Sequence, residues 1–166
     1  MTEQIRIAPA AESETPLILS FIRKLAEYEK LSHLVVATEA DIHQNVFGPN
    51  PVAEVLLAHW DGAPVGFALY FRNFSTFLGQ PGIYLEDLFV EPQHRGKGIG
   101  KALLIRLAEI AIERGYGRLE WAVLDWNTPS IEFYRRLGAV PLDEWTAYRL
   151  TGEALSRLAL GDRSRP

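Results

Sequence analysis

Two periods of hydrophobic residues run through the chain, one typical of helices and one typical of strands. Over residues 16–30 apolar side chains recur every three or four positions, as on one face of a helix. Residues 38–47, 99–114 and 128–137 are predicted as further helices. Thr15 and Thr38 are the expected N-caps of the first two, and Gly115 and Gly138 are the expected ends of the last two.

The remaining apolar runs are rich in β-branched and aromatic residues and are short enough for strands. They cover residues 5–7, 52–60, 64–71, 83–90, 118–124 and 145–150. Asp61 and Gly62 between the second and third runs predict a hairpin turn. Along the chain, a group of consecutive strands is followed by a part in which strands and helices alternate. This order predicts a mixed α/β sheet with helices on both faces.

Length and composition fit one soluble globular domain. The chain has 166 residues, of which 48% are apolar and 23% charged, and no internal repeat or linker interrupts it. We therefore expect a single domain over residues 1–166, with its core at about 5–150. There is no cysteine, and the four histidines lack metal-ligand spacing, so we expect neither disulfides nor a metal site.

Charge and hydropathy restrict the partners. The formal net charge of −4 argues against nucleic acid and is compatible with a cationic small molecule. The first residues lack a basic segment followed by an apolar run, and no apolar stretch is long enough to cross a bilayer. We expect a cytoplasmic protein that binds neither membrane nor nucleic acid.

The most informative stretch is a glycine-rich turn between a predicted strand and a predicted helix, at residues 95–101 (RGKGIGK). Unpaired N–H groups at the start of a helix attract anions, and glycines let the backbone approach a phosphate closely. Arg95, Lys97 and Lys101 add positive charge. A P-loop would need Ser or Thr after Lys101, where Ala102 stands, and a dinucleotide fingerprint would need glycine at 101.

The spacing Arg95-x-x-Gly98-x-Gly100 instead resembles the pyrophosphate signature of the GNAT acetyltransferases. Further segments resemble that family in the same order along the chain, with the diamine (spermidine/spermine) and thialysine acetyltransferases as the most similar branch. They are residues 25–31 (LAEYEKL), 47–48 (FG), 65–71 (VGFALYF), 75–76 (ST), 84–87 (YLED), 122–127 (AVLDWN), 129–134 (PSIEFY) and 138–139 (GA). The resemblance implies the GNAT fold, with a mixed, mostly antiparallel, twisted sheet of the α/β (α+β) class. It also implies acetyl-CoA as co-substrate and a homodimer.

The resemblance also assigns roles by position. The residues expected to hold acetyl-CoA are Leu88, Phe89, Val90, Arg95, Gly96, Lys97, Gly98, Ile99, Gly100, Lys101, Asn127, Pro129, Ser130 and Tyr134. The residues expected to face the amine substrate are Tyr28, Glu29, Ser75, Thr76, Glu86, Asp87, Glu120, Trp121 and Ala122.

The reaction itself needs a base and an acid. An alkyl amine has a pKa near ~10.4, so at neutral pH it is almost entirely protonated and must lose a proton before it attacks. Following the resemblance, we expect Glu86 to take that proton, through water, and Tyr134 to protonate the leaving thiolate, whose pKa is near ~8.5. Since neighbouring strand residues face opposite ways, Glu86 and Asp87 share one face only if a bulge re-aims one of them.

Plainer interpretations stand beside these. Glu86 and Asp87 could form a solvated strand edge, Tyr134 could be a core residue, and Glu29 could be an ordinary surface residue. At the level of function, we expect acetyl transfer to a small cationic amine of the thialysine, diamine or polyamine type. The alternatives are a protein or peptide lysine acetyltransferase and a non-catalytic acyl-CoA-binding module.

Overall fold

The structure is a computed structural model that describes residues 4–161. Residues 1–3 and 162–166 lie outside the described residues. The chain divides into two compact units, residues 1–124 and residues 125–166. No helix among the described residues has the length and apolar character needed to cross a membrane.

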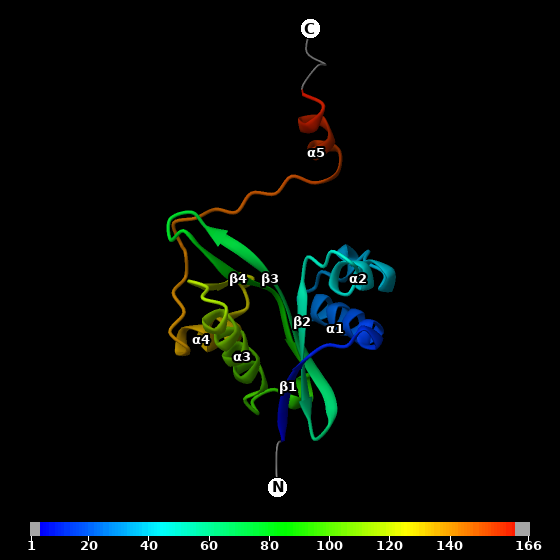
Figure 1. The fold of residues 1–166 in the computed structure, drawn as a ribbon, viewed down its shortest axis with the longest axis vertical. Helices are drawn as coiled ribbons and strands as arrows, with labels where there is room; N and C mark the ends of the chain where they lie inside the picture. Colours follow the sequence, from blue (N-terminus) through cyan, green and yellow to red (C-terminus); the bar gives the residue numbers. More distant parts are fainter. Residues whose placement is uncertain (1–3, 162–166) are drawn as a thin grey trace. The chain divides into compact units, whose positions relative to one another are not determined.

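The first unit is built on a five-stranded sheet whose strands follow chain order (Figure 1). The strands are β1 (Ile5–Pro9), β2 (Glu54–Trp60), β3 (Ala63–Ser75), β4 (Gln80–Val90) and β5 (Leu119–Trp121). The first four are antiparallel, whereas β5 runs parallel to β4. The expected mixed, mostly antiparallel sheet is confirmed.

Helices cover both faces of this sheet, as expected. The helices α1 (Thr15–Tyr28) and α2 (Glu39–Val46) lie on one face, and α3 (Ile99–Glu113) lies on the other (Figure 1). We call these the α1 face and the α3 face. On the α1 face the core is a buried cluster of Ile18, Phe21, Val55, Leu57, Phe67 and Phe89.

A β-bulge interrupts the pairing of β3 with β4. Leu69 pairs with Asp87, but its neighbour Tyr70 pairs with Leu85, so Glu86 is the extra residue. Bulges re-aim side chains and are frequent next to active sites. Because of this bulge, Glu86 does not follow the simple alternation that would have placed its side chain on the face of the sheet opposite to that of Asp87.

The caps and ends of several elements differ from the sequence expectation. Thr38 caps α2 as predicted and accepts a hydrogen bond from the N–H of Asp41 at 3.2 Å. Thr15 was expected to be an N-cap, but it is the first residue of α1. Its hydroxyl donates to the carbonyl of Glu12 at 2.7 Å, because a short 3-10 turn, η1 (Glu12–Glu14), leads directly into the helix.

Two strand predictions near the end of the chain need correction. The run at 118–124 forms a strand only over β5, and residues 145–150 form no strand. In the latter run Tyr148 is 94% exposed, and within residues 4–161 no strand pairs with the run. A β-rich composition does not form a strand without such a partner.

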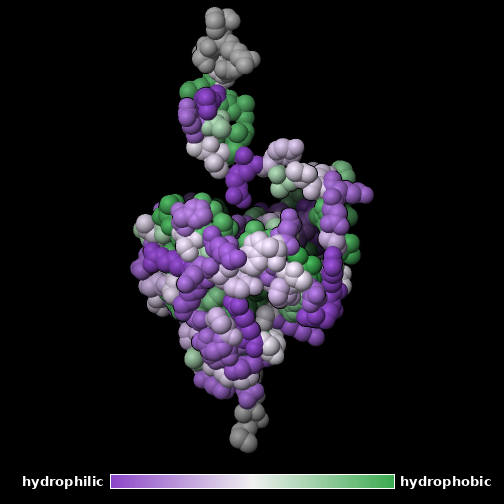
Figure 2. Space-filling model, turned by 180° about the vertical axis from the view of Figure 1, so that it is seen from behind, coloured by the Kyte–Doolittle hydropathy of each residue, from purple (hydrophilic) through white to green (hydrophobic). Residues whose placement is uncertain are grey.

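The second unit contains α4 (Thr128–Arg136) and α5 (Gly152–Ala159). Asn127 caps α4 and accepts a hydrogen bond from the N–H of Ser130 at 3.4 Å. Helix α5 carries apolar side chains on its surface (Figure 2), including Leu155 and Leu158.

Candidate active site

The glycine loop follows β4 through the short turn η3 (Pro92–His94) and opens α3. Gly96 and Gly98 have φ angles of 76° and 86°, and Gly98 is the N-cap of α3. These left-handed conformations favour glycine, and the space where a Cβ would stand is open at both positions. The unpaired N–H groups at the start of α3 therefore face a ligand with little steric hindrance, which fits a bound phosphate.

Two of the loop's cationic side chains rest on aromatic rings. The Nε of Arg95 donates to the carbonyl of Val90 at 2.9 Å, and its guanidinium lies 4.6 Å from the centre of the Tyr28 ring. The ammonium of Lys97 lies 4.7 Å from the centre of the Trp60 ring. Such contacts stabilise a cation without neutralising it, so both charges remain at the loop.

The edge of β4 next to the loop lacks a neighbour on one side. Pairing with β5 ends at Leu85 and Trp121, so from Glu86 to Val90 no strand of the described chain lies on that side of β4. This stretch contains Leu88, Phe89 and Val90, whose backbone groups were expected to meet the pantetheine arm. An unpaired edge can accept an extended ligand as an additional strand.

A group of three carboxylates lies at the bulge. Glu29 directly follows α1, and Glu86 and Asp87 come from β4. The charges of Glu86 and Glu29 both act on Asp87 and raise its pKa. The end of α1 and the bulge therefore bring together three of the residues expected at the substrate side.

Asp87 is the most perturbed of the three. Burial, followed by the charges of Glu86 and Glu29, raises its pKa to about 7 from an ordinary value of 3.8. Burial also raises the pKa of Glu29. A carboxyl group with a pKa near neutrality is frequent at sites that bind cations or transfer protons.

Beyond the carboxylates, the α1 face of the sheet continues with aromatic and polar side chains. The rings of Phe71 and Tyr84 stack with their centres 5.2 Å apart. The amide of Asn73 donates to Glu120 at 2.9 Å. The Nε of Arg118 lies 2.8 Å from the same carboxylate. Arg118 was not predicted, although it stands two residues before Glu120 and alternation places both on one face.

The other residues expected at the substrate side come from the far end of β3 and from the end of β5. Ser75 is the last residue of β3 and Thr76 begins the β3–β4 turn, and the hydroxyl of Ser75 accepts from the N–H of Leu78 at 3.2 Å. Ser75 stands six residues beyond Leu69, which is about 20 Å along a strand. Trp121 pairs with Leu85 and faces away from Glu120, while Ala122 follows the end of β5.

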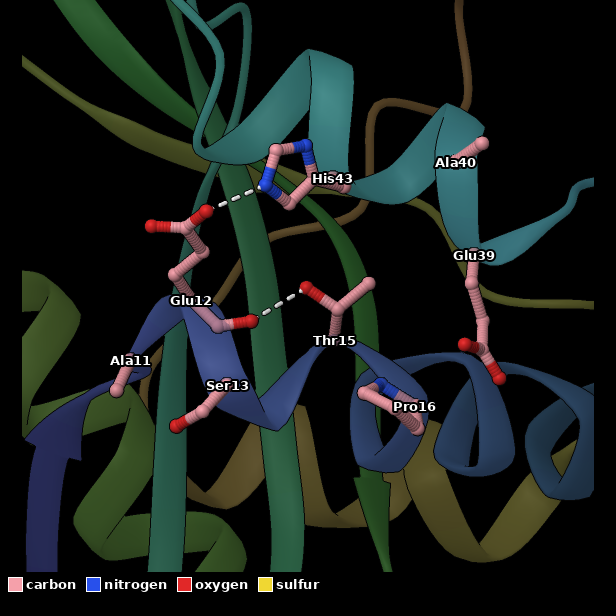
Figure 3. A pocket seen from close by; sticks show the side chains of 8 residues that line it. All are labelled: Ala11, Glu12, Ser13, Thr15, Pro16, Glu39, Ala40 and His43. Carbon is pink, nitrogen blue, oxygen red and sulfur yellow. Dashed lines mark hydrogen bonds and ion pairs between the residues drawn. The ribbon is translucent and has the colours of Figure 1, made fainter.

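An open depression of about 770 Å³ lies between the start of α1 and α2 (Figure 3). Its wall includes Glu12 and His43, whose side chains are 2.6 Å apart. None of the residues expected to bind either substrate lines it. Because the carboxylates and the glycine loop lie elsewhere, this hollow does not define the active site.

Comparison with known proteins identifies the family of the chain. Residues 20–139 match the model of the acetyltransferase (GNAT) family. The chain belongs to the GNAT family. Members of this family use acetyl-CoA as co-substrate, so this GNAT chain is an acetyltransferase.

Two curated relatives and one solved structure resemble this GNAT chain over nearly its whole length. The mouse thialysine N-epsilon-acetyltransferase is 41% identical, over 93% of this chain and 96% of the relative. An L-ornithine N5-acetyltransferase of Arabidopsis thaliana is 32% identical, over 92% of this chain and 87% of the relative. An integron cassette protein from the mobile metagenome of V. cholerae has a TM-score of 0.79 and 30% identity, over 95% of this chain and 99% of its own.

The remaining expected site residues belong to the second unit. Asn127 is buried and caps α4, so its side chain already has a structural task. Pro129 and Ser130 lie in the first turn of α4, where Pro is well tolerated. Tyr134 is partly buried in α4, and its ring centre lies 5.4 Å from that of Phe133.

Proposed function

We propose that this GNAT enzyme transfers the acetyl group of acetyl-CoA to the terminal amine of a small cationic substrate. The observation that carries the proposal is the carboxylate group of Glu29, Glu86 and Asp87 at the β4 bulge. It lies beside the unpaired edge of β4, only a few residues before the glycine loop. The names of the relatives, which act on thialysine and L-ornithine, support an amine at the end of a short chain.

The carboxylates have two tasks in this proposal. They attract the cationic substrate, and one of them takes the proton that the ammonium must lose. Glu86 is the proposed base, acting through water, because it is the residue that the bulge re-aims. Asp87 titrates near neutral pH and sets the charge of the group, so its ionisation controls how strongly the cation is held.

The glycine loop and α4 serve the acetyl donor in this proposal. Gly96, Gly98 and the first turn of α3 hold the pyrophosphate, while Arg95, Lys97 and Lys101 supply positive charge. Tyr134 gives its hydroxyl proton to the sulfur as the carbon–sulfur bond breaks and the nitrogen–carbon bond forms. The ammonium loses two protons in becoming an amide: one passes through water to Glu86 and from there to solvent, and the other passes through water to the Tyr134 oxygen, which restores the hydroxyl. For Tyr134, as for Asn127, Pro129 and Ser130, the support is the family resemblance.

We also propose a homodimer in the cytoplasm, without nucleic acid or membrane as partner. The net charge of −4 and the family resemblance support the choice of partners. Exposed aromatic residues support association of two copies, among them Phe77 at the β3–β4 turn, which is 94% exposed. Sedimentation at several protein concentrations tests this part, and a monomer at micromolar concentration would refute it.

The test of the proposed activity is turnover of acetyl-CoA with a panel of free amines and a lysine-containing peptide. Thiol release and the mass of the acetylated product are measured together. Turnover with small cationic amines supports the proposal, and turnover with the peptide alone favours a protein lysine acetyltransferase. Tight binding of acetyl-CoA without any turnover would show a non-catalytic module.

A further inference from the structure

The remote end of the proposed substrate site carries a balanced pair of opposite charges. Glu120, which stands there, was expected to face the amine substrate. In the structure its carboxylate is compensated by Arg118 at 2.8 Å and accepts from Asn73 at 2.9 Å. A second ammonium group, as at the far end of a polyamine, would therefore meet a paired carboxylate and a guanidinium.

We infer that Arg118 and Glu120 recognise the α-amino acid head group of the substrate, and that the enzyme selects amino acids with a terminal amine over diamines and polyamines. The inference rests on the proposed function, since it names the substrate class of the same site. In this arrangement Arg118 binds the α-carboxylate and Glu120 binds the α-ammonium. A zwitterion matches a neighbouring pair of opposite charges, whereas a dication does not.

The guanidinium of Arg118 is available for such a ligand. Its Nε is buried and close to Glu120, but the N–H does not point at that oxygen, so the contact is an ion pair without a hydrogen bond. Within residues 4–161 its two terminal NH₂ groups make no hydrogen bond. A carboxylate can accept two parallel hydrogen bonds from a guanidinium, which makes arginine the residue best suited to this task.

The spacing along the sheet matches the size of such a substrate. On β3, Leu69 stands beside Asp87, and Asn73 stands four residues further, about 13 Å along the strand. Glu120 is in register with Tyr84, between these two positions. A lysine-like molecule extends about 8 Å from its terminal nitrogen to its carboxylate carbon, at roughly 1.3 Å for each bond. The side chain of Arg118 covers the part of this distance that the substrate does not.

The absence of a side chain at Gly82 leaves room for Asn73 and Arg118. A Cβ at this position would lie 2.7 Å from Oδ1 of Asn73 and 2.8 Å from Cγ of Arg118. The same Asn73 oxygen is buried and has no hydrogen-bond partner in the described structure. The absence of a side chain at position 82 therefore leaves room for the arrangement that the inference requires, and Gly82→Ala displaces it without changing any charge.

The test compares each amino acid with the diamine that differs from it only by the carboxylate. The pairs are L-ornithine with 1,4-diaminobutane, and L-lysine with 1,5-diaminopentane. For the wild type we expect kcat/KM to favour the amino acid by tenfold or more in at least one pair. Arg118→Gln should reduce this preference by about tenfold to a hundredfold, mainly through KM of the amino acid, which is the size of a charge-assisted contact. Arg118→Lys should retain part of it.

Matched controls separate recognition from folding. Arg72→Gln removes an exposed arginine from the same part of the sheet on the α3 face, and it should leave the preference as in the wild type. Gly82→Ala should weaken the preference as Arg118→Gln does. Turnover of the diamine and the melting temperature show whether each variant is folded. Fragmentation of the product must place the acetyl group on the side-chain amine.

The outcomes are distinct. A preference that is equal in wild type and Arg118→Gln, or a wild type that favours diamines, overturns the inference and leaves the proposed function standing. Failure to acetylate any amine refutes the proposed function, and the inference with it.

Discussion

Replacing Asp87 with asparagine should stabilise the protein, and the gain should grow with pH. The folded protein raises the pKa of this carboxyl to about 7 from 3.8, so it holds the proton more tightly than the unfolded chain does. Between these values, folding becomes less favourable as pH rises, because the folded state must ionise a carboxyl beside Glu86 and Glu29. Asparagine cannot ionise and avoids this cost.

The magnitude follows from the pH interval. At 1.36 kcal/mol per pH unit, the cost grows by about 2.7 kcal/mol between pH 5 and pH 7 and is constant above the folded pKa. Asp87 is partly exposed, and solvent screening lowers this figure. We therefore expect the stability advantage of Asp87→Asn over wild type to be about 2 kcal/mol larger at pH 8 than at pH 5.

Urea unfolding of both proteins at pH 5, 6.5 and 8 measures the effect. Glu27→Gln is the control, since it removes an exposed carboxylate of α1. Asp87→Asn should also bind the cationic substrate more weakly than the wild type does. The inflection near pH 7 that we expect in the kcat/KM of the wild type should be absent in Asp87→Asn. A stability difference that is the same at all three pH values would refute the account of the carboxylate group.

Three further predictions concern the remaining parts of the site. Glu86→Gln should lower kcat by about 10²–10⁴, the usual contribution of a general base, while acetyl-CoA affinity stays as in the wild type; wild-type kcat would contradict the assignment. Gly98→Ala should weaken acetyl-CoA binding by tenfold or more. Its control is Gly115→Ala, because Gly115 also has a positive φ (68°) and open space at its Cβ position, so the substitution carries the same backbone cost of about 1–2 kcal/mol but should leave acetyl-CoA binding unchanged. Equal binding by both variants in calorimetry would show that the loop is only a connector. Tyr134→Phe should lower kcat by about tenfold, and this loss should shrink above pH ~8.5, where the leaving thiolate needs no proton. Phe133→Leu, which alters the neighbouring ring, is the control, and a loss of kcat that does not depend on pH would argue for a packing role of Tyr134.

Much of the fold could be predicted because hydrophobic periodicity and turn residues agree locally. Helix α3 and the glycine loop before it match their predicted positions, and Thr38 caps α2 as expected. The run at 145–150 shows the limit of this reasoning. Its residues favour a strand, but whether a strand forms depends on a neighbour elsewhere in the chain, which local sequence does not encode.

The candidate site, too, could be predicted from the sequence only in part. The family motif pointed to Glu86 and Asp87, but alternation alone placed them on opposite faces, and only the pairing of β3 with β4 reveals the bulge. Glu120 was predicted to face the amine substrate. Its compensation by Arg118 could have been noticed from their spacing of two residues, because alternate residues of a strand share a face.

The central claim is that the enzyme acetylates the terminal amine of a small cation, and one measurement tests it most directly. Acetyl-CoA is supplied with a terminal-amine amino acid, a diamine and an uncharged-tail monoamine of equal length, and thiol release is followed for the wild type and Glu86→Gln. The account predicts turnover of the cationic amines, a lower kcat/KM for the monoamine than for the amino acid, and loss of turnover in the variant. Equal kcat/KM for the amino acid and the monoamine, or undiminished turnover in Glu86→Gln, would contradict it.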